Sequence, residues 1–217
     1  MNNPAQPSYF TAEEWGITYQ DPTSSVPWTD RTPARRECFM SPGGGVSYNY
    51  GSGPGRREYR SVEMTPAVAR IMEDVNERLW SNVPRDYSRT CNTVDAYRTA
   101  FELHPSRLLL NGCFLNHYRD QTHALGWHAD DFPGMDHRHP LVVVSFGEER
   151  EIWVRPKGFK GRVPEGSRWK LASASVFVMP PRYQHDYEHR IPKGGRRMGP
   201  RTSLTFRRFL PPGSGAV

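Results

Sequence analysis

The stretch PRTSLTFR (residues 200–207) alternates polar and apolar side chains in the way that a β-strand requires. One face of such a strand would carry four polar side chains, Arg201, Ser203, Thr205 and Arg207. Leu204 and Phe206 would point the opposite way. Two arginines on an inward polar face need an anion against them, because a buried guanidinium is costly without a counter-charge. The alternation therefore predicts a strand that binds a small dicarboxylate.

Further strands are predicted by four β-branched or aromatic runs, each bounded by Gly, Pro or charged clusters: LLLNGCFLNHY (108–118), LVVVSFG (141–147), EIWVR (151–155) and ASVFVM (174–179). The chain also contains 20 prolines and 19 glycines, which disfavours an architecture of long helices. Several short strands with few helices between them favour a sandwich or jelly roll. We therefore predict a mainly β (α+β) fold.

Two helices are expected in the N-terminal part of the chain. Thr11 and Glu14 form a capping box for a short one. The longer helix has Thr65 as its N-cap and Pro66 at its first position. Its apolar residues fall on one face at helical spacing: Val68, Ile71, Met72, Val75 and Leu79. We expect this helix to pack against a sheet and to take no part in chemistry.

The length of 217 residues suits one domain. We expect residues 1–35 to be a polar, proline-rich N-terminal segment, residues 36–210 to be the domain, and residues 211–217 to be a flexible tail. The β core should occupy about residues 105–210. The stretch SPGGGVSYNYGSGPGRREY (41–59) is rich in glycine and predicts a loop with aromatic and basic residues set into it.

The net charge of +6 favours a nucleic-acid partner, because neutralising phosphates releases counterions. Cys38, Cys91 and Cys113 are odd in number and none forms a CxxC pair, so neither a disulfide framework nor a thiolate zinc site is indicated. The N-terminus lacks the pattern of a signal peptide, and no stretch is long and apolar enough for a membrane span. We expect a cytoplasmic monomer, or a nuclear one in a eukaryote.

A metal site is predicted by GWHADD (126–131). His128 and Asp130 are two residues apart, so on extended chain both side chains point to the same side. With one further histidine they would form the two-histidine, one-carboxylate set that suits Fe(II) and leaves three positions open. Spacing alone leaves four candidates for that histidine: His185 and His189 in RYQHDYEHRIP (182–192), and His137 and His139 in GMDHRHP (134–140).

Six motifs in order resemble the AlkB family of Fe(II)/2-oxoglutarate dioxygenases: LNHY (115–118), GWHADD (126–131), VVSFGEER (143–150), VFVM (176–179), HRIP (189–192) and PRTSLTFR (200–207). The fold that this resemblance implies is a double-stranded β-helix, or jelly roll. The resemblance weakens toward the N-terminus, where YNYGSG (48–53) is similar to part of the family's nucleotide-recognition lid. The lid would then span about residues 36–60.

The resemblance assigns His128, Asp130 and His189 as ligands of Fe(II). It implies 2-oxoglutarate as co-substrate, with Asn116 and Tyr118 holding it from a neighbouring strand. Arg201 would pair with the distal carboxylate of 2-oxoglutarate and Arg207 would lie near the carboxylate that chelates the metal. Ser203 also belongs to this binding face, although many relatives have an asparagine there. O2 would be the oxidant.

The activity implied is oxidative removal of alkyl groups from bases of DNA or RNA, with the base single-stranded or flipped out of the duplex. Tyr50 would stack on the base and Tyr48 would contact backbone phosphate. Asp131 would contact the base or support the ligand loop, and Arg35 and Arg36 would contact phosphates. Phe132 stands where several relatives have an acidic residue, which leaves the base preference open.

Two alternatives remain open from the sequence. The same oxygenase chemistry could act on a protein side chain or a small molecule. A relative without turnover could bind nucleic acid only, although the intact set of His128, Asp130, His189, Arg201 and Arg207 argues against a loss of catalysis.

Overall fold

The computed structural model describes residues 6–16, 19–50, 57–80 and 110–210. Cys91, the expected tail at 211–217 and the first two residues of the strand predicted at 108–118 lie outside this part of the chain. Among the described residues, no helix combines the length and the apolar content that a membrane crossing needs.

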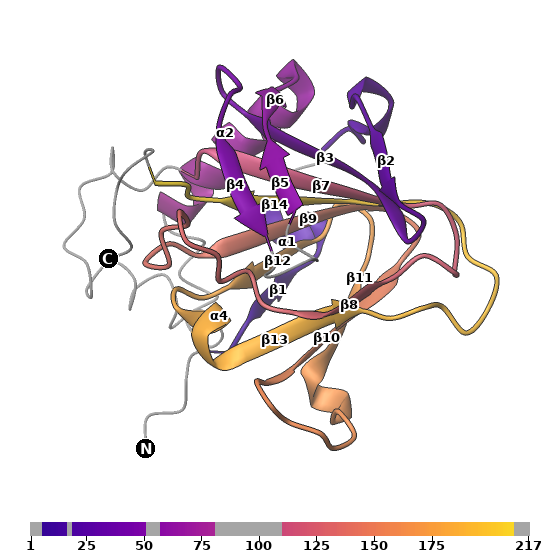
Figure 1. Cartoon of the computed structure of the whole chain (residues 1–217). Helices are drawn as coiled ribbons and strands as arrows, with labels where there is room; N and C mark the ends of the chain where they lie inside the picture. The colour runs from indigo at the N-terminus through magenta and orange to yellow at the C-terminus, as the bar shows by residue number, and fades with distance from the viewer. Residues whose placement is uncertain (1–5, 17–18, 51–56, 81–109, 211–217) are drawn as a thin grey trace.

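Two sheets face each other and form the body of the protein (Figure 1). The larger sheet has the strand order β1 (Ser8–Phe10), β12 (Val176–Met179), β9 (Leu141–Gly147), β14 (Arg201–Arg207), β7 (Gly112–Tyr118), β3 (Arg35–Ser41) and β2 (Thr29–Thr32). A short strand, β6 (Val62–Glu63), pairs in parallel with β3. The smaller sheet has the order β11 (Arg168–Leu171), β10 (Arg150–Pro156), β13 (Tyr187–Ile191) and β8 (Leu125–His128).

The strands from β7 onward divide between the sheets in a jelly-roll pattern. β7, β9, β12 and β14 lie in the larger sheet, whereas β8, β10, β11 and β13 lie in the smaller one. The chain thus crosses between the sheets after nearly every strand, and every pairing among these eight strands is antiparallel. The predicted mainly β jelly roll is confirmed.

β14 lies at the centre of the larger sheet, between β7 and β9. Its register places Arg201 opposite Tyr118 of β7 and Gly147 of β9. Ser203 lies opposite Asn116 and Ser145 in the same way. Because β14 has a partner on both sides, its residues are held in place along the whole strand, which suits it to carry a binding site.

Two hydrophobic clusters cover the two faces of the larger sheet. Leu204 and Phe206 of β14 are fully buried against α2 (Pro66–Trp80), whose apolar stripe is the predicted one. The second cluster fills the space between the sheets and includes Phe177 and Ile152. The polar residues of β14 face this second space, so the alternation read from the sequence is confirmed.

The N-terminal segment contributes to the same fold. β1 pairs with β12 at the edge of the larger sheet, and β2 pairs with β3. The short helix α1 (Ala12–Trp15) has the predicted capping box, in which the Glu14 backbone N–H donates to Thr11 Oγ1. Its Trp15 is buried in the same cluster as α2. The polar composition of residues 1–35 concealed these contacts, because a few apolar side chains make them.

Two parts of the glycine-rich stretch form paired strands, so its prediction as a loop is wrong for residues 47–50 and 57–59. β4 (Ser47–Tyr50) pairs with β5 (Arg57–Arg60), and the two form a small sheet separate from the other two (Figure 1). Residues 51–56 between them are outside the described residues. The lid was expected to begin at residue 36. Residues 36–41 instead belong to β3, which is an interior strand of the larger sheet. Tyrosine and arginine side chains alternating in SYNY and REYR favour strands, and the glycines around them masked that signal.

Candidate metal centre and anion site

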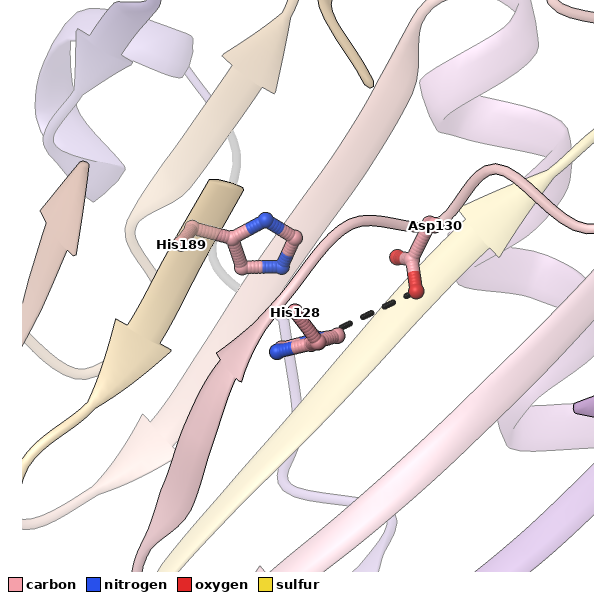
Figure 2. Close-up of side chains that lie close together, drawn as sticks. All are labelled: His128, Asp130 and His189. Atoms are coloured by element: carbon pink, nitrogen blue, oxygen red, sulfur yellow. Dashed lines mark ion pairs between the residues drawn. The ribbon is translucent and has the colours of Figure 1, made fainter. Parts of the chain in front are cut away.

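Three side chains converge between the two sheets at one end of β8. Ligand atoms of His128, Asp130 and His189 all lie within 4.8 Å of one another, a group able to hold a metal ion. His128 Nε2 is 3.9 Å from Asp130 Oδ1, and the two imidazole rings have their centroids 4.2 Å apart (Figure 2). His128 and His189 face each other across β8 and β13. The strand pairing thus brings together residues 61 positions apart in the chain.

The orientation of His128 favours metal binding through Nε2. Its Nδ1 lies 2.9 Å from the carbonyl oxygen of Gly126. A carbonyl can only accept a hydrogen bond, so Nδ1 carries the proton and Nε2 carries the lone pair. Such a contact fixes both the tautomer and the ring orientation of a histidine ligand.

Asp130 is buried and held from two directions. Arg207 Nη2 donates to Asp130 Oδ2 at 2.6 Å, and the Asp130 backbone N–H donates to Gln184 Oε1 at 3.0 Å. Burial by itself would raise the pKa of Asp130, but the charges of Arg207, His128 and His189 together hold that pKa below its usual value. The carboxylate is therefore ionised and can serve as a metal ligand.

Burial also sets the protonation of the two histidines. It lowers the pKa of His189 to about 3, and the neighbouring His128 acts in the same direction. Burial lowers the pKa of His128 as well, against the opposing charge of Asp130. Both imidazoles are therefore neutral near pH 7, which is the form that binds a metal. Two neutral imidazoles and one carboxylate match the donor set that suits Fe(II).

The structure separates the other candidate histidines from this group. His185 lies in α4 (Tyr183–Asp186), and its ring contacts His137 at a centroid distance of 4.8 Å. His139 Nδ1 lies 3.2 Å from Asp136 Oδ2. Of the four candidates for the third ligand, His189 is thus the one placed beside His128 and Asp130.

Arg201 forms the second part of the site. The residue is 1% exposed, and its Nη2 donates to Ser145 Oγ at 2.8 Å. Its Nε and Nη1 are buried without a hydrogen-bond partner among the described residues. Burial lowers the pKa of Arg201 to about 10, against the opposing effect of Tyr118, so the group remains charged at neutral pH. A buried cation with unsatisfied donors fits an anionic ligand.

A polar network connects β3 with β7 beside the metal group. Arg35 Nε donates to Asn116 Oδ1 at 2.6 Å, and its Nη2 lies 2.5 Å from Glu37 Oε1. The hydroxyl of Tyr59 in β5 donates to Glu37 Oε2 at 3.0 Å. Glu37 therefore holds both Arg35 and Tyr59 in place.

A pocket opens at this network and reaches the metal group. The residues that line it come from β3, β5, β7, β8, β14 and the loop after β8: Arg35, Tyr59, Phe114, Asn116, Leu125, His128, Asp130 and Arg207. Tyr118, Ser203 and Arg201 follow along the same strands, away from Arg207. The predicted residues of the metal and anion sites are thus neighbours on one face of the larger sheet and the opposing β8 and β13.

The structure places one of the predicted substrate residues at the pocket and others away from it. Arg35 lines the pocket, but Arg36 points to the other face of β3 and pairs with Asp30 at 3.3 Å. Asp131 is 47% exposed and pairs with Lys157 at 2.6 Å. Phe132 is buried in an aromatic cluster with Phe209. The side chains of Tyr48 and Tyr50 lie outside the described part of the chain.

The sequence analysis missed several residues of the site, among them Ser145, Glu37 and Gln184. Ser145 is a lone hydroxyl in the apolar run LVVVSFG, a signal that could have revealed it. Glu37 follows Arg35 by two positions and so shares its strand face. Gln184 had no signal in the sequence, because its contact with Asp130 depends on the position of α4.

Comparison with known proteins finds similar sequences among AlkB homologues. No family model matches the chain. The chain is 34% identical over 105 residues to mouse "DNA oxidative demethylase ALKBH2", and 32% identical over 111 residues to mouse "Alpha-ketoglutarate-dependent dioxygenase alkB homolog 3". It is 24% identical over 216 residues to the human protein of the latter description.

The chain is thus similar in sequence to proteins that are named as AlkB homologues. The match covers 46% of the chain and 44% of the first mouse protein, and 49% of the chain and 39% of the second. The match to the human protein covers 97% of the chain and 67% of that protein. The chain thus spans less than half the length of the mouse relatives that it matches. A solved structure described as "The structure of OsALKBH1" is 18% identical, with a TM-score of 0.49 over 91% of this chain and 88% of that one.

Proposed function

We propose that this AlkB-like chain is an Fe(II)- and 2-oxoglutarate-dependent dioxygenase that removes alkyl groups from nucleic-acid bases. The observation that carries the proposal is the convergence of His128, Asp130 and His189 between the two sheets, in the space that the unsatisfied guanidinium of Arg201 also faces. The names of the relatives, an oxidative demethylase of DNA and an alpha-ketoglutarate-dependent dioxygenase, support the reaction class.

In the proposed reaction the chain holds a metal and a co-substrate in fixed positions. His128, Asp130 and His189 would bind Fe(II), and bound Fe(II) with 2-oxoglutarate and O2 would supply oxidation of an alkyl carbon on nitrogen. Arg207 holds the Asp130 carboxylate by one oxygen and leaves Oδ1 directed toward His128. The hydrogen bond from His128 to Gly126 keeps the ring in its ligand orientation.

The remaining residues of this face would bind 2-oxoglutarate. Arg201 offers its two free donors to the distal carboxylate, and Tyr118 lies beside it. Asn116 and Ser203 occupy the stretch between Arg201 and Arg207 on paired strands. The burial of this face excludes water, which strengthens each charged contact with the dicarboxylate.

We propose a base of single-stranded DNA or RNA, or one flipped out of a duplex, as the substrate. Support comes from the position of the metal group, which is buried between two sheets and so is out of reach of a base inside a duplex. Arg35 lines the pocket and would contact the nucleotide, while Tyr48 and Tyr50 belong to the hairpin next to it. The charge of +6 supports the same partner.

A monomer in a reducing compartment is part of the same proposal. Cys38 and Cys113 are free thiols, and burial raises the pKa of Cys38 to about 11. Thiols in this state resist oxidation, which suits the cytoplasm or nucleus. Light scattering after gel filtration tests the oligomeric state.

The proposal is tested by turnover of 2-oxoglutarate and by release of formaldehyde. The protein with Fe(II), 2-oxoglutarate, O2 and ascorbate is incubated with N-methylated oligonucleotides, single-stranded and duplex, and with methylated nucleosides. We expect succinate and formaldehyde in equal amounts from at least one oligonucleotide. His128→Ala should abolish both products, whereas His185→Ala, which removes a histidine outside the metal group, should retain them.

Two results would count against the proposal. Turnover of 2-oxoglutarate at the unaltered rate in His128→Ala would contradict the ligand assignment. Formaldehyde release from methylated peptides or small amines, with none from any nucleic acid, would replace the nucleic-acid substrate by the alternative one.

A further inference from the structure

The outer face of the smaller sheet carries a row of alternating arginine and tryptophan side chains. The row crosses all four strands: Arg168 in β11, Trp153 in β10, Arg190 in β13 and Trp127 in β8. Trp153 lies opposite Arg168 on one side and Arg190 on the other in the strand register. These side chains point away from the metal group, because their neighbours Ile152, His189 and Ile191 face inward.

Each guanidinium of the row stacks on an indole. Arg168 Cζ is 4.3 Å and Arg190 Cζ is 4.2 Å from the centroid of the Trp153 ring. Arg190 Cζ is also 4.9 Å from Trp127, which Arg155 covers at 4.0 Å. A stacked guanidinium keeps its plane against the ring and presents the edge with its N–H groups outward. The row is therefore rigid and already oriented for an anion.

Positive charge on this face exceeds the negative charge. Arg155 pairs with Glu188 at 2.6 Å, and Glu151 accepts from the Trp153 indole N–H at 2.7 Å. Arg190 has no hydrogen-bond or ion-pair partner among the described residues, and its Nε is buried. Burial, together with the adjacent Arg155 and Arg168, lowers its pKa. An arginine held among other arginines without a carboxylate is completed by an external anion.

Neighbouring basic residues extend the charged surface. Exposed Lys170 lies on the same outer face as Arg168, two residues further along β11. A surface groove beside the row is lined by Trp153, Arg190 and Lys193, among others. A second groove, which Glu149 and Glu151 also line, continues past Lys193 to Arg196, and Arg196 pairs with Glu148 at 3.0 Å. The basic residues therefore extend along the surface and are not confined to one place.

The row ends next to the pocket. β8 is the edge strand of the smaller sheet, with Trp127 on its outer face and His128, the next residue, in the metal group (Figure 1). Leu125 and His128 of β8 line the pocket. A chain that leaves the pocket over this edge comes onto the outer face at Trp127. Crossing four strands spaced about 4.8 Å apart takes it roughly 14 Å from Trp127 to Arg168.

We propose that the outer face of the smaller sheet is a second contact surface, on which Arg190 and Arg168 bind phosphates of the single strand that flanks the base in the pocket. The inference rests on the proposed function for the identity of the polyanion. The guanidinium groups cover the indole faces, so this surface binds the phosphate backbone and not the bases. A duplex is too stiff to turn around the edge of β8, whereas a single strand can follow it.

The test compares oligonucleotides that differ in the length of their flanks. Fluorescence anisotropy measures the binding of a 5-nucleotide single strand with a central methylated base, and of longer strands extended by about ten nucleotides on the 5′ or the 3′ side. We expect Arg190→Gln and Lys170→Gln each to weaken one of the extended strands by about 3- to 10-fold and to leave the short strand unchanged. The logarithm of the association constant decreases as log[salt] rises. This dependence should become less steep by about one for each phosphate that the variant no longer binds.

The matched control is Arg70→Gln, an exposed charge removed from α2, which lies on the far side of the larger sheet. It should leave every affinity unchanged. Lys170→Gln tests the same surface if Arg190→Gln does not fold. Lys170 is exposed and takes no part in the stack, so its replacement should leave the fold intact. Turnover of a methylated nucleoside, which cannot reach the outer face, should be the same in all three variants.

The outcomes separate this proposal from the proposed function. If methylated strands are demethylated but neither variant changes the affinity for an extended strand, the second surface is wrong and the activity stands. If no substrate is turned over yet both variants weaken the extended strand, the surface stands and the activity is wrong. Equal binding of poly-glutamate with the same dependence on Arg190 would replace the nucleic acid by an acidic peptide.

Discussion

At the scale of single residues, the site depends on charges that are buried with an incomplete set of partners. Arg201 keeps a charge in the interior with one hydrogen bond to Ser145. Asp130 is the opposite case, because Arg207 donates to its carboxylate and Gln184 accepts from its backbone N–H. The difference indicates their roles: the satisfied group holds its own orientation, and the unsatisfied one is completed by a ligand.

We expect Arg201→Gln to raise the KM for 2-oxoglutarate about 10- to 100-fold, because a hydrogen bond to a charged group contributes about 1.5–3 kcal/mol. Succinate release at increasing 2-oxoglutarate concentration measures the effect. Arg197→Gln removes an exposed charge a few residues earlier and should leave the KM unchanged. An unaltered KM in Arg201→Gln would contradict the assignment of Arg201 to the binding of 2-oxoglutarate.

Glu37 is predicted to stabilise the fold as well as the pocket. Glu37→Gln removes a buried charge from the contacts with Arg35 and Tyr59 and should lower the free energy of unfolding by about 2 kcal/mol. Urea denaturation gives this value. The exposed Glu63→Gln should change it by less than about 0.5 kcal/mol. Equal stability of the two variants would mean that the network is of no energetic consequence.

At the scale of elements, the larger sheet separates a packing face from a chemical face. α2 covers one face through Val68, Ile71 and Val75, which are almost fully buried. The other face carries the polar residues of β14 toward β8 and β13. One strand thus serves both purposes, since successive side chains of a strand point to opposite faces.

The consequence is that a defect in α2 should reduce stability without changing the site. Ile71→Ala should lower the free energy of unfolding by about 2–5 kcal/mol, because it leaves a cavity in the core. The KM for 2-oxoglutarate of the folded protein should stay the same. The exposed Glu73→Ala on the same helix is the control and should change neither quantity. A changed KM in Ile71→Ala would show that the two faces are coupled.

At the scale of the whole molecule, metal binding joins the two sheets. His128 and His189 come from the smaller sheet and its edge, and Asp130 is tied to β14 of the larger sheet through Arg207. A cation on these three residues would therefore link both layers. Binding to the folded state alone raises stability, by about 2.7 kcal/mol at a ligand concentration 100 times the Kd.

We accordingly expect Mn(II), a redox-inactive substitute, to raise the Tm in a concentration-dependent way. EDTA should reverse the shift, and addition of 2-oxoglutarate should enlarge it. His189→Ala should lose most of the response, whereas His185→Ala should keep it. Differential scanning calorimetry at constant pH makes the comparison. The same shift in His189→Ala would place the metal elsewhere.

Most of the fold could be predicted from side-chain alternation. β9 at 141–147 and α2 from Pro66 agree with the predicted ranges, because each has a strong apolar period of its own. β4 and β5 were predicted as loop, since glycines surround them. β1 and β2 gave no prediction, because strands of three and four residues at a sheet edge are too short for a periodic signal.

The sequence by itself determined the polar face of β14, the pair His128 and Asp130, and the mainly β class. These properties follow from the period of two along a strand, which is a local property of the chain. The tertiary structure alone decided which of four histidines joins the pair, that Glu37 and Gln184 support the site, and that Arg168, Trp153, Arg190 and Trp127 form one row. Those contacts depend on the register between strands distant in the sequence, and no periodicity within one segment specifies that register.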